Sequence, residues 1–165
     1  MTDSKPSKSQ RKRQHAELQA IGERLLSLQE DQLASLGLDE RLVRALDDAR
    51  RMKSHEAQRR QKQYIGRLMR EVDPQPIKDL FANLKTDERR QKRIFANAER
   101  WRDRLINEGH EALRAFASET GQTDAELAEL LTQYASASSD RSETTVRRKI
   151  FRRVHETLAA RSRDG

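Results

Sequence analysis

The sequence has no cysteine, and its 165 residues include only three prolines, six glycines and seven aromatic side chains. Without cysteine, the chain cannot form disulfides, thiolate zinc sites or a cysteine nucleophile. The scarcity of proline, glycine and β-branched residues favours long helices over a sheet. No apolar run approaches the ~20 residues needed to cross a bilayer, and the polar N-terminus lacks the apolar segment of a secretory signal. We therefore expect a soluble, cytoplasmic protein.

Large apolar side chains are also scarce, since Leu, Ile, Val and Phe together supply only 32 residues. Such a composition predicts a thin core spread along amphipathic helices, in one or two small domains. We predict an all-α, elongated multihelical protein in which an N-terminal antiparallel helical hairpin packs with a second small helical bundle. The predicted segments are a flexible basic arm (residues 1–8), the hairpin plus a short helix (9–84), the C-terminal bundle (85–160) and a frayed tail (161–165).

The spacing of apolar residues predicts the individual helices. A first helix over residues 9–36 carries a stripe of apolar residues from Leu18 to Leu28, and a second helix covers residues 40–72. Gly37 fits a C-terminal stop for the first helix, and Asp39 fits an N-cap for the second. Asp73 and Pro74 predict an N-cap and a first helical residue for a short helix that carries apolar residues from Ile77 to Leu84. A further helix is expected from a Thr86 cap to Gly109, followed by a helical piece before Gly121. A Thr123–Glu126 capping box predicts the start of the next helix, and the last helix is expected over residues 142–160. Five aromatic residues fall at apparent core positions: Phe81, Phe95, Trp101, Phe116 and Phe151.

Positive charge is the strongest compositional signal, with 34 Lys and Arg against 27 Asp and Glu. Residues 50–70 hold eight basic side chains and one acidic one, and Lys53, Arg60 and Arg67 recur every seven residues, so we expect them on one flank of a helix. Between residues 53 and 63 only Ala57 is apolar, which indicates a solvated bridge or a binding surface. Residues 5–13 and 141–153 are also basic, whereas residues 110–140 are acidic.

Three basic surfaces on one short chain favour binding to a polyanion, and the dominance of arginine favours phosphate. We find no aromatic platform on which single-stranded bases would stack, so phosphate contacts with folded RNA or a duplex are favoured. The candidate RNA-binding residues are Lys8, Arg11, Lys12, Arg13, Lys53, Arg59, Arg60, Lys62, Arg67, Arg70, Arg148, Lys149 and Arg152.

Signals for catalysis or cofactor binding are missing. The glycines are isolated, so no phosphate-binding loop is present, and Gly22 and Gly66 fall inside helices, where close helix crossing explains them. The four histidines show no pairing at metal-ligand spacing. No carboxylate pair stands out as an acid–base couple. We expect neither an enzyme nor a bound metal or cofactor.

Several stretches together are similar to the DarP (YjgA-type) ribosome-associated proteins of proteobacteria, over roughly residues 7–160. They are residues 7–9 (SKS), 59–70 (RRQKQYIGRLMR), Asp73 with residues 76–77 (PI), 102–106 (RDRLI) with Gly109, and 148–151 (RKIF). The resemblance implies a helical assembly factor that associates with late precursors of the large (50S) ribosomal subunit. It also implies that the protein helps 23S ribosomal RNA (rRNA) near the peptidyl transferase centre to reach its mature fold, and that the protein needs no cofactor.

Two other interpretations remain open from the sequence. A protein-interaction adaptor would bind acidic protein surfaces through its basic helices and use the stripe from Leu18 to Leu28 as a coiled-coil interface. A DNA-compacting protein would fit the positive charge but not the acidic residues 110–140.

Overall fold

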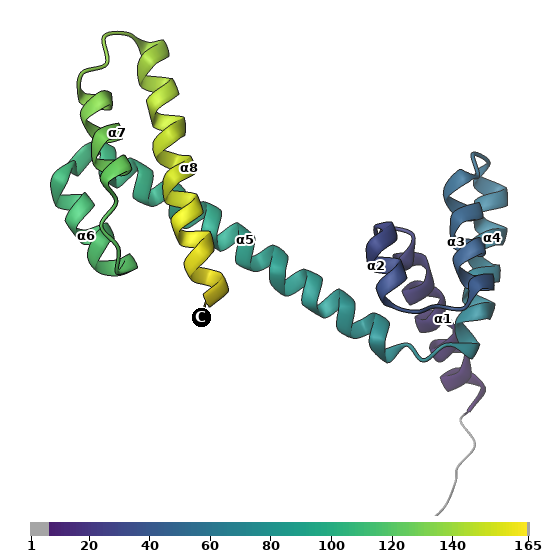
Figure 1. The fold of residues 1–165 in the computed structure, drawn as a ribbon. Coiled ribbons are helices and arrows are strands. Elements are labelled where there is room, and N and C mark those ends of the chain that lie inside the picture. Colours follow the sequence, from purple (N-terminus) through teal and green to yellow (C-terminus); the bar gives the residue numbers. More distant parts are fainter. Residues whose placement is uncertain (1–6, 165) are drawn as a thin grey trace, which may run out of the picture. The chain divides into compact units, whose positions relative to one another are not determined.

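The structure, a computed structural model, describes residues 7–164, and no strand occurs among them. The all-α prediction is therefore confirmed (Figure 1). The chain divides between Leu84 and Lys85 into two compact units, here called unit 1 and unit 2. The elements are α1 (Lys8–Leu25), α2 (Glu30–Ser35), α3 (Glu40–Arg51), α4 (His55–Leu68), the 3-10 helix η1 (Met69–Glu71), α5 (Gln75–Glu108), α6 (His110–Thr120), α7 (Ala125–Ala135) and α8 (Asp140–Asp164).

Unit 1 is built around the packing of α1 on α4. The two helices run antiparallel, because Glu23 pairs with Lys62 at 3.3 Å while the earlier Gln19 lies against the later Gly66. Glycine on each helix allows a close approach: a methyl group at Gly22 would lie 2.8 Å from side-chain carbons of α4 and η1, and one at Gly66 would lie 3.0 Å from Gln19. The predicted role of both glycines in helix crossing is confirmed.

The first predicted helix is wrong in its length, because residues 9–36 form two helices instead of one. The chain leaves the α1 path after Leu25, where the guanidinium group of Arg50, from α3, donates hydrogen bonds to the carbonyl oxygens of Leu25, Leu26 and Leu28. These carbonyls are satisfied by a side chain from a distant element instead of by further helical amides. The first helix therefore ends well before Gly37, which itself follows α2 with a φ of 57°.

The second predicted helix, over residues 40–72, is also interrupted. It is replaced by α3 and α4, joined by a short turn, with the Ser54 hydroxyl accepting a hydrogen bond from the amide of Ala57. The side chain of Gln58 donates to the carbonyl of Met52 at 2.6 Å, and that of Gln61 donates to the carbonyl of Ala45 at 2.9 Å. The polar stretch that looked like a solvated bridge therefore forms the turn and one wall of a helical hairpin.

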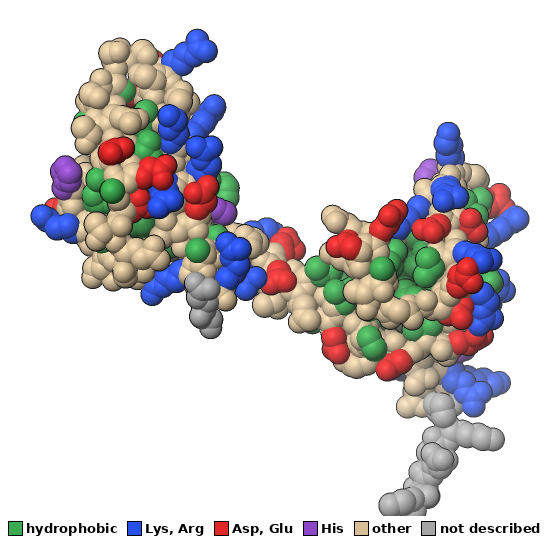
Figure 2. Space-filling model, viewed as in Figure 1, with side chains coloured by type: hydrophobic (Ala, Val, Ile, Leu, Met, Phe, Trp, Pro, Cys, Tyr) green, Lys and Arg blue, Asp and Glu red, His purple; other side chains and the backbone are tan. Residues whose placement is uncertain are grey.

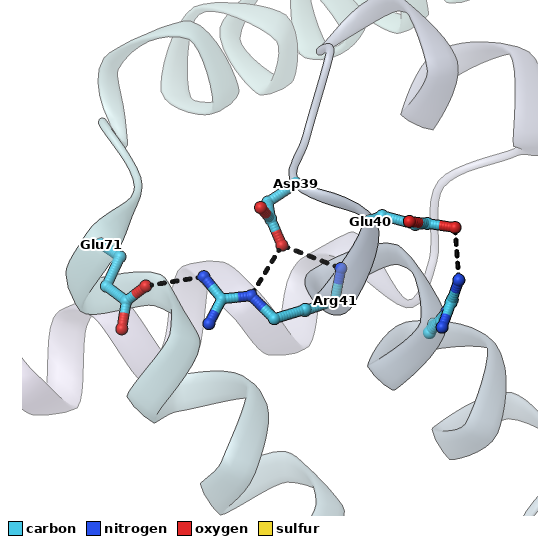
Figure 3. A network of polar contacts seen from close by, with 5 residues as sticks. Asp39, Glu40, Arg41 and Glu71 are labelled. Carbon is cyan, nitrogen blue, oxygen red and sulfur yellow. Dashed lines mark hydrogen bonds and ion pairs between the residues drawn. The ribbon is translucent and has the colours of Figure 1, made fainter.

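An ion-pair network connects the base of this hairpin (Figure 3). Asp39 caps α3, as predicted, and the pKa of its carboxyl is lowered mainly by a hydrogen bond from the backbone amide of Arg41 and next by one from the Arg41 side chain. The same guanidinium reaches Glu71 of η1 at 3.0 Å. Arg41 thereby connects the start of α3 to η1, the 3-10 helix that follows α4.

Residues 77–84 and the segment after Thr86 do not form separate helices, because α5 is continuous. Asp73 accepts a hydrogen bond from the amide of Gln75 at 3.0 Å and marks its start, as expected. The predicted cap at Thr86 is wrong: no glycine or proline interrupts residues 77–108, and ion pairs such as Glu88–Lys92 support the polar middle of the helix. The first part of α5 contributes Ile77 to the core of unit 1.

Unit 2 has its own core, formed by α5, α6, α7 and α8. Trp101 and Phe116 meet edge to face at its centre, with ring centroids 5.1 Å apart. Gly109 and Gly121, with φ values of 57° and 74°, end α5 and α6 as predicted. The cap of α7 is Asp124 and not Thr123, because its buried carboxylate accepts from an amide of α7 at 3.0 Å.

Both predicted ends of the chain differ from the structure. The Ser7 hydroxyl caps α1 and Lys8 is its first residue, so within the predicted arm Lys8 is helical and Ser7 is its cap. Residues 1–6 lie outside the described residues. At the other end, α8 starts at Asp140 instead of residue 142 and continues through the predicted tail to Asp164.

The core prediction fails for one aromatic residue. Phe81, Trp101 and Phe116 are buried and Phe151 is half-buried, but Phe95 is 49% exposed. Phe95 immediately follows Ile94, whose side chain occupies the core face of α5, so the neighbouring position points away from it.

Candidate nucleic-acid interface

One exposed cationic surface of unit 1 lies on α4 and η1. Arg59, Arg60, Arg67 and Arg70 are all exposed, while Ile65 on the opposite side of α4 is completely buried against α1. The core contact thus fixes which side of α4 faces solvent. Lys and Arg side chains are visible along the edge that α4 forms, with acidic side chains among them (Figure 2). We call the four arginines the α4 basic face.

The members of the α4 basic face differ in how freely they can bind an anion. Arg60 forms an ion pair with Glu56 one turn earlier, and the guanidinium of Arg67 lies over the ring of Tyr64, 5.6 Å from its centroid. Arg59 and Arg70 have no ion-pair partner among the described residues. At least part of this positive charge is therefore not neutralised within unit 1.

The structure separates two other candidates from this face. Lys53 lies in the turn between α3 and α4, so it does not continue the flank formed by Arg60 and Arg67, and that part of the prediction is wrong. Lys62 is half-buried and holds Glu23 of α1 at 3.3 Å, which directs its ammonium group toward the helix crossing. Its charge contributes to holding α1 on α4.

The N-terminal candidates lie on the first turns of α1. Lys8, Arg11, Lys12 and Arg13 are exposed and helical, and the Ser7 cap with its reciprocal bond from Gln10 stabilises that start. The predicted helix from residue 9 is therefore confirmed for Arg11, Lys12 and Arg13, and only Lys8 departs from the predicted flexible arm over residues 1–8.

In unit 2 the structure divides the three candidates on α8 between two hollows. Arg148 lines one hollow beside Phe95 and Phe151. Lys149 and Arg152 line another of about 270 Å³ that also contains the acidic residues Glu126, Glu129 and Glu156. Lys149 and Arg152 therefore share their hollow with acidic residues, of which Glu126 pairs with Arg153 at 3.5 Å, whereas Arg148 lies in the other hollow.

Sequence reasoning missed a set of arginines on α5. Arg90, Arg93 and Arg100 line a cleft of about 550 Å³ together with Arg161 of α8. The Nε atom of Arg90 is buried and has no hydrogen-bond partner, although its Nη2 pairs with Asp87 at 3.1 Å. A signal was available, because residues 85–104 hold eight basic residues against four acidic ones. The apolar stripe in residues 85–104 predicts a helix but not this basic surface.

Asp103 organises a second group of arginines on α5 and α8. Its carboxylate accepts from Arg102 at 2.8 and 3.1 Å and from Arg147 at 2.7 Å. These contacts, the hydrogen bond from Arg102 above all, lower the pKa of Asp103. At neutral pH the carboxylate therefore stays ionised and holds both guanidinium groups in place.

Residues 7–164 contain no cluster of His, Asp or Glu that could hold a metal ion. In the same part of the chain, no helix combines the length and the apolar character needed to cross a membrane.

Comparison with known proteins gives a family match over most of the chain. Residues 4–155 match the family model described as "Dual-action ribosomal maturation protein DarP". The protein of that name from Idiomarina loihiensis is 37% identical over 159 residues, which cover 95% of this chain and 93% of the relative. The one from Nitrosomonas eutropha is 40% identical over 122 residues (74% and 69%), and that from Thiobacillus denitrificans is 37% identical over 159 residues (94% and 88%).

Proposed function

The chain belongs to the DarP family of dual-action ribosomal maturation proteins, and we propose that it binds rRNA in late precursors of the large (50S) ribosomal subunit. The RNA partner is then 23S rRNA. By binding one conformation of the precursor better than competing folds, the protein shifts the RNA toward its mature arrangement near the peptidyl transferase centre. It acts in the cytoplasm through binding alone, without catalysis or a cofactor.

The observation that carries this proposal is the α4 basic face. Its arginines are exposed on the side of α4 that is fixed by the α1 contact, so they are presented to a partner without rearrangement of the core. Guanidinium groups suit phosphate because their planar donors match two oxygens at once. Arg59 and Arg70 meet the phosphates directly, and Arg60 and Arg67 do so after releasing weak local partners.

Two further surfaces extend the proposed contact. The first turns of α1 contribute Lys8, Arg11, Lys12 and Arg13. Unit 2 contributes Arg148 and the cleft that is lined by Arg90, Arg93, Arg100 and Arg161. Lys149 and Arg152 contribute from the hollow that they share with acidic residues of α7. Because phosphate contacts release condensed counterions, each one adds to the dependence of affinity on salt.

The adaptor alternative loses its proposed interface. Ile21, Leu25 and Leu28 of the apolar stripe are buried in the core of unit 1, so they are not available to a coiled-coil partner.

A salt titration with charge variants tests the proposal. The triple variant Arg59→Gln/Arg60→Gln/Arg67→Gln is compared with wild type for binding to purified large-subunit precursor particles and to deproteinised 23S rRNA. The slope of log affinity against log salt should decrease by about 2 to 3 units if all three arginines contact phosphates. The matched Arg→Lys triple variant keeps the charge and should keep the slope. A Gln variant with an unchanged slope would remove these residues from the interface, and stronger binding to duplex DNA than to rRNA would favour the DNA-compacting alternative.

A further inference from the structure

Unit 2 displays a cluster of aromatic rings at the edge of its core. Phe95 of α5 and Phe151 of α8 meet edge to face with centroids 5.0 Å apart, and His155 lies 5.8 Å from Phe151 and 6.4 Å from Phe95. Phe95 is 49% exposed, and Tyr64 is the only other large hydrophobic side chain that is exposed among the described residues. An edge-to-face contact leaves at least one face of each phenylalanine ring uncovered by the other ring.

Three guanidinium groups border these rings. Arg102, Arg147 and Arg148 line a hollow of about 330 Å³ together with Phe95, Phe151, Thr144 and one acidic residue, Glu99, which lies 3.8 Å from Arg102. The guanidinium carbon of Arg102 lies 5.7 Å from the centroid of the Phe151 ring, within the range of a cation–π contact. Arg148 has no ion-pair partner among the described residues.

Two of these arginines are held in place before any ligand arrives. Asp103 accepts two hydrogen bonds from Arg102 and one from Arg147, so it fixes both side chains beside the hollow. A ligand that uses them loses less side-chain entropy on binding than one that must order free arginines. The rings are similarly restricted, because Phe151 is half-buried and packs against the core of unit 2.

We propose that this hollow receives an unpaired base of RNA, stacked on Phe95, with phosphates of the same strand on Arg147 and Arg148. The inference rests on the proposed function and gives that function a preference for RNA segments that are not yet paired. It also reverses the expectation that the chain has no stacking platform, because that expectation placed Phe95 in the core.

Charge complementarity favours RNA over a protein partner. An apolar side chain of another protein would remove water from Arg148, which has no ion-pair partner among the described residues, without neutralising its charge, which is costly. A nucleotide instead supplies a flat π system for the rings and an anion for the arginines at the same time. Every base has such a face, so the contact tolerates different sequences.

Substitutions at Phe95 separate stacking from general apolar contact. Binding of a short unpaired RNA is compared with binding of an RNA duplex of equal length for wild type, Phe95→Ala, Phe95→Leu and Phe95→Trp. We expect Phe95→Ala to weaken binding of the unpaired RNA by about 5- to 150-fold, the range that base–aromatic stacking supports. Phe95→Leu should lose almost as much, Phe95→Trp should restore binding, and the affinity for the duplex should stay unchanged. Far-UV circular dichroism checks that each variant is folded.

Salt dependence provides a second and independent readout. Phe95→Ala should leave the salt slope for the unpaired RNA unchanged, whereas Arg148→Gln should lower it by about 1 unit. Binding of the unpaired RNA retained in Phe95→Leu would overturn the proposal, because leucine offers apolar area but no ring on which a base can stack. Equal losses for unpaired RNA and duplex would also overturn it. If Phe95 variants bind like wild type while the α4 Gln variant fails, only this inference falls. If wild type binds neither RNA nor precursor particles, the proposed function falls with it.

Discussion

Replacing Gly22 by alanine perturbs the helix crossing that presents the α4 basic face. Within an exposed helix, alanine is more stable than glycine by about 1 kcal/mol. At Gly22, however, the new methyl carbon would lie 2.8 Å from Cγ2 of Ile65 and from Cγ of Met69, and both of these side chains are fully buried. Overpacking of this kind costs about 1–3 kcal/mol, and β-branched Ile65 has little freedom to move aside. We expect a net loss of up to about 2 kcal/mol in the free energy of unfolding.

The matched control is Ala20→Gly, at an exposed position of the same helix. Helix propensity alone predicts opposite signs for the two substitutions, whereas the clash makes both destabilising. Urea unfolding followed by far-UV circular dichroism measures the change. Trp101, the single tryptophan, lies in unit 2, so its fluorescence should report an unchanged transition. The reasoning would be refuted if Gly22→Ala raised the free energy of unfolding by about as much as Ala20→Gly lowered it.

Two further predictions concern unit 2, and Trp101 fluorescence during urea unfolding measures both. Asp124→Ala removes the cap of α7 and the carboxylate that lies 2.6 Å from Nε of Arg153, and it should lower the free energy of unfolding by about 1–2 kcal/mol. Asp124→Asn keeps a capping oxygen and should lose less. Equal losses for the two variants would contradict the capping role. The pKa of Asp103 is lowered in the folded state by Arg102, so its stabilising contribution is complete above the ordinary carboxyl pKa of 3.8 and is lost as the pH falls through the lowered value. Asp103→Asn should remove this part of the acid dependence, and an unchanged pH profile would show that the carboxylate contributes none of it.

Local signals in the sequence predicted the helix boundaries that depend on neighbouring residues. Asp39 caps α3, and Gly109 and Gly121 end their helices, because a side-chain oxygen or a positive φ acts within one turn. The apolar stripe from Leu18 to Leu28 also predicted the buried face of α1, where Ile21 and Leu25 lie in the core. Patterns of this kind need no knowledge of the tertiary structure.

Boundaries and exposures that depend on distant residues were not predictable in the same way. The end of α1 at Leu25 depends on Arg50, which is 25 positions away in the chain. Thr86 has the chemistry of a cap, but the uninterrupted helix formers around it prevail. Phe95 is a different case, because the helical spacing of Ile94, Ala98, Trp101 and Leu105 already places Ile94 on the buried face and Phe95 beside it. The assignment of rRNA-binding residues stays a prediction.

The most direct test of the central claim is sedimentation of a cell lysate through sucrose gradients at increasing salt, probing for this protein. We predict that it migrates with the large subunit and its precursors at low salt and returns to the top of the gradient as salt rises, because its contacts are to phosphates. The Arg59→Gln/Arg60→Gln/Arg67→Gln variant should leave the particles at lower salt than wild type, and the Arg→Lys triple variant should not. A protein that stays at the top of the gradient at every salt concentration would contradict the account.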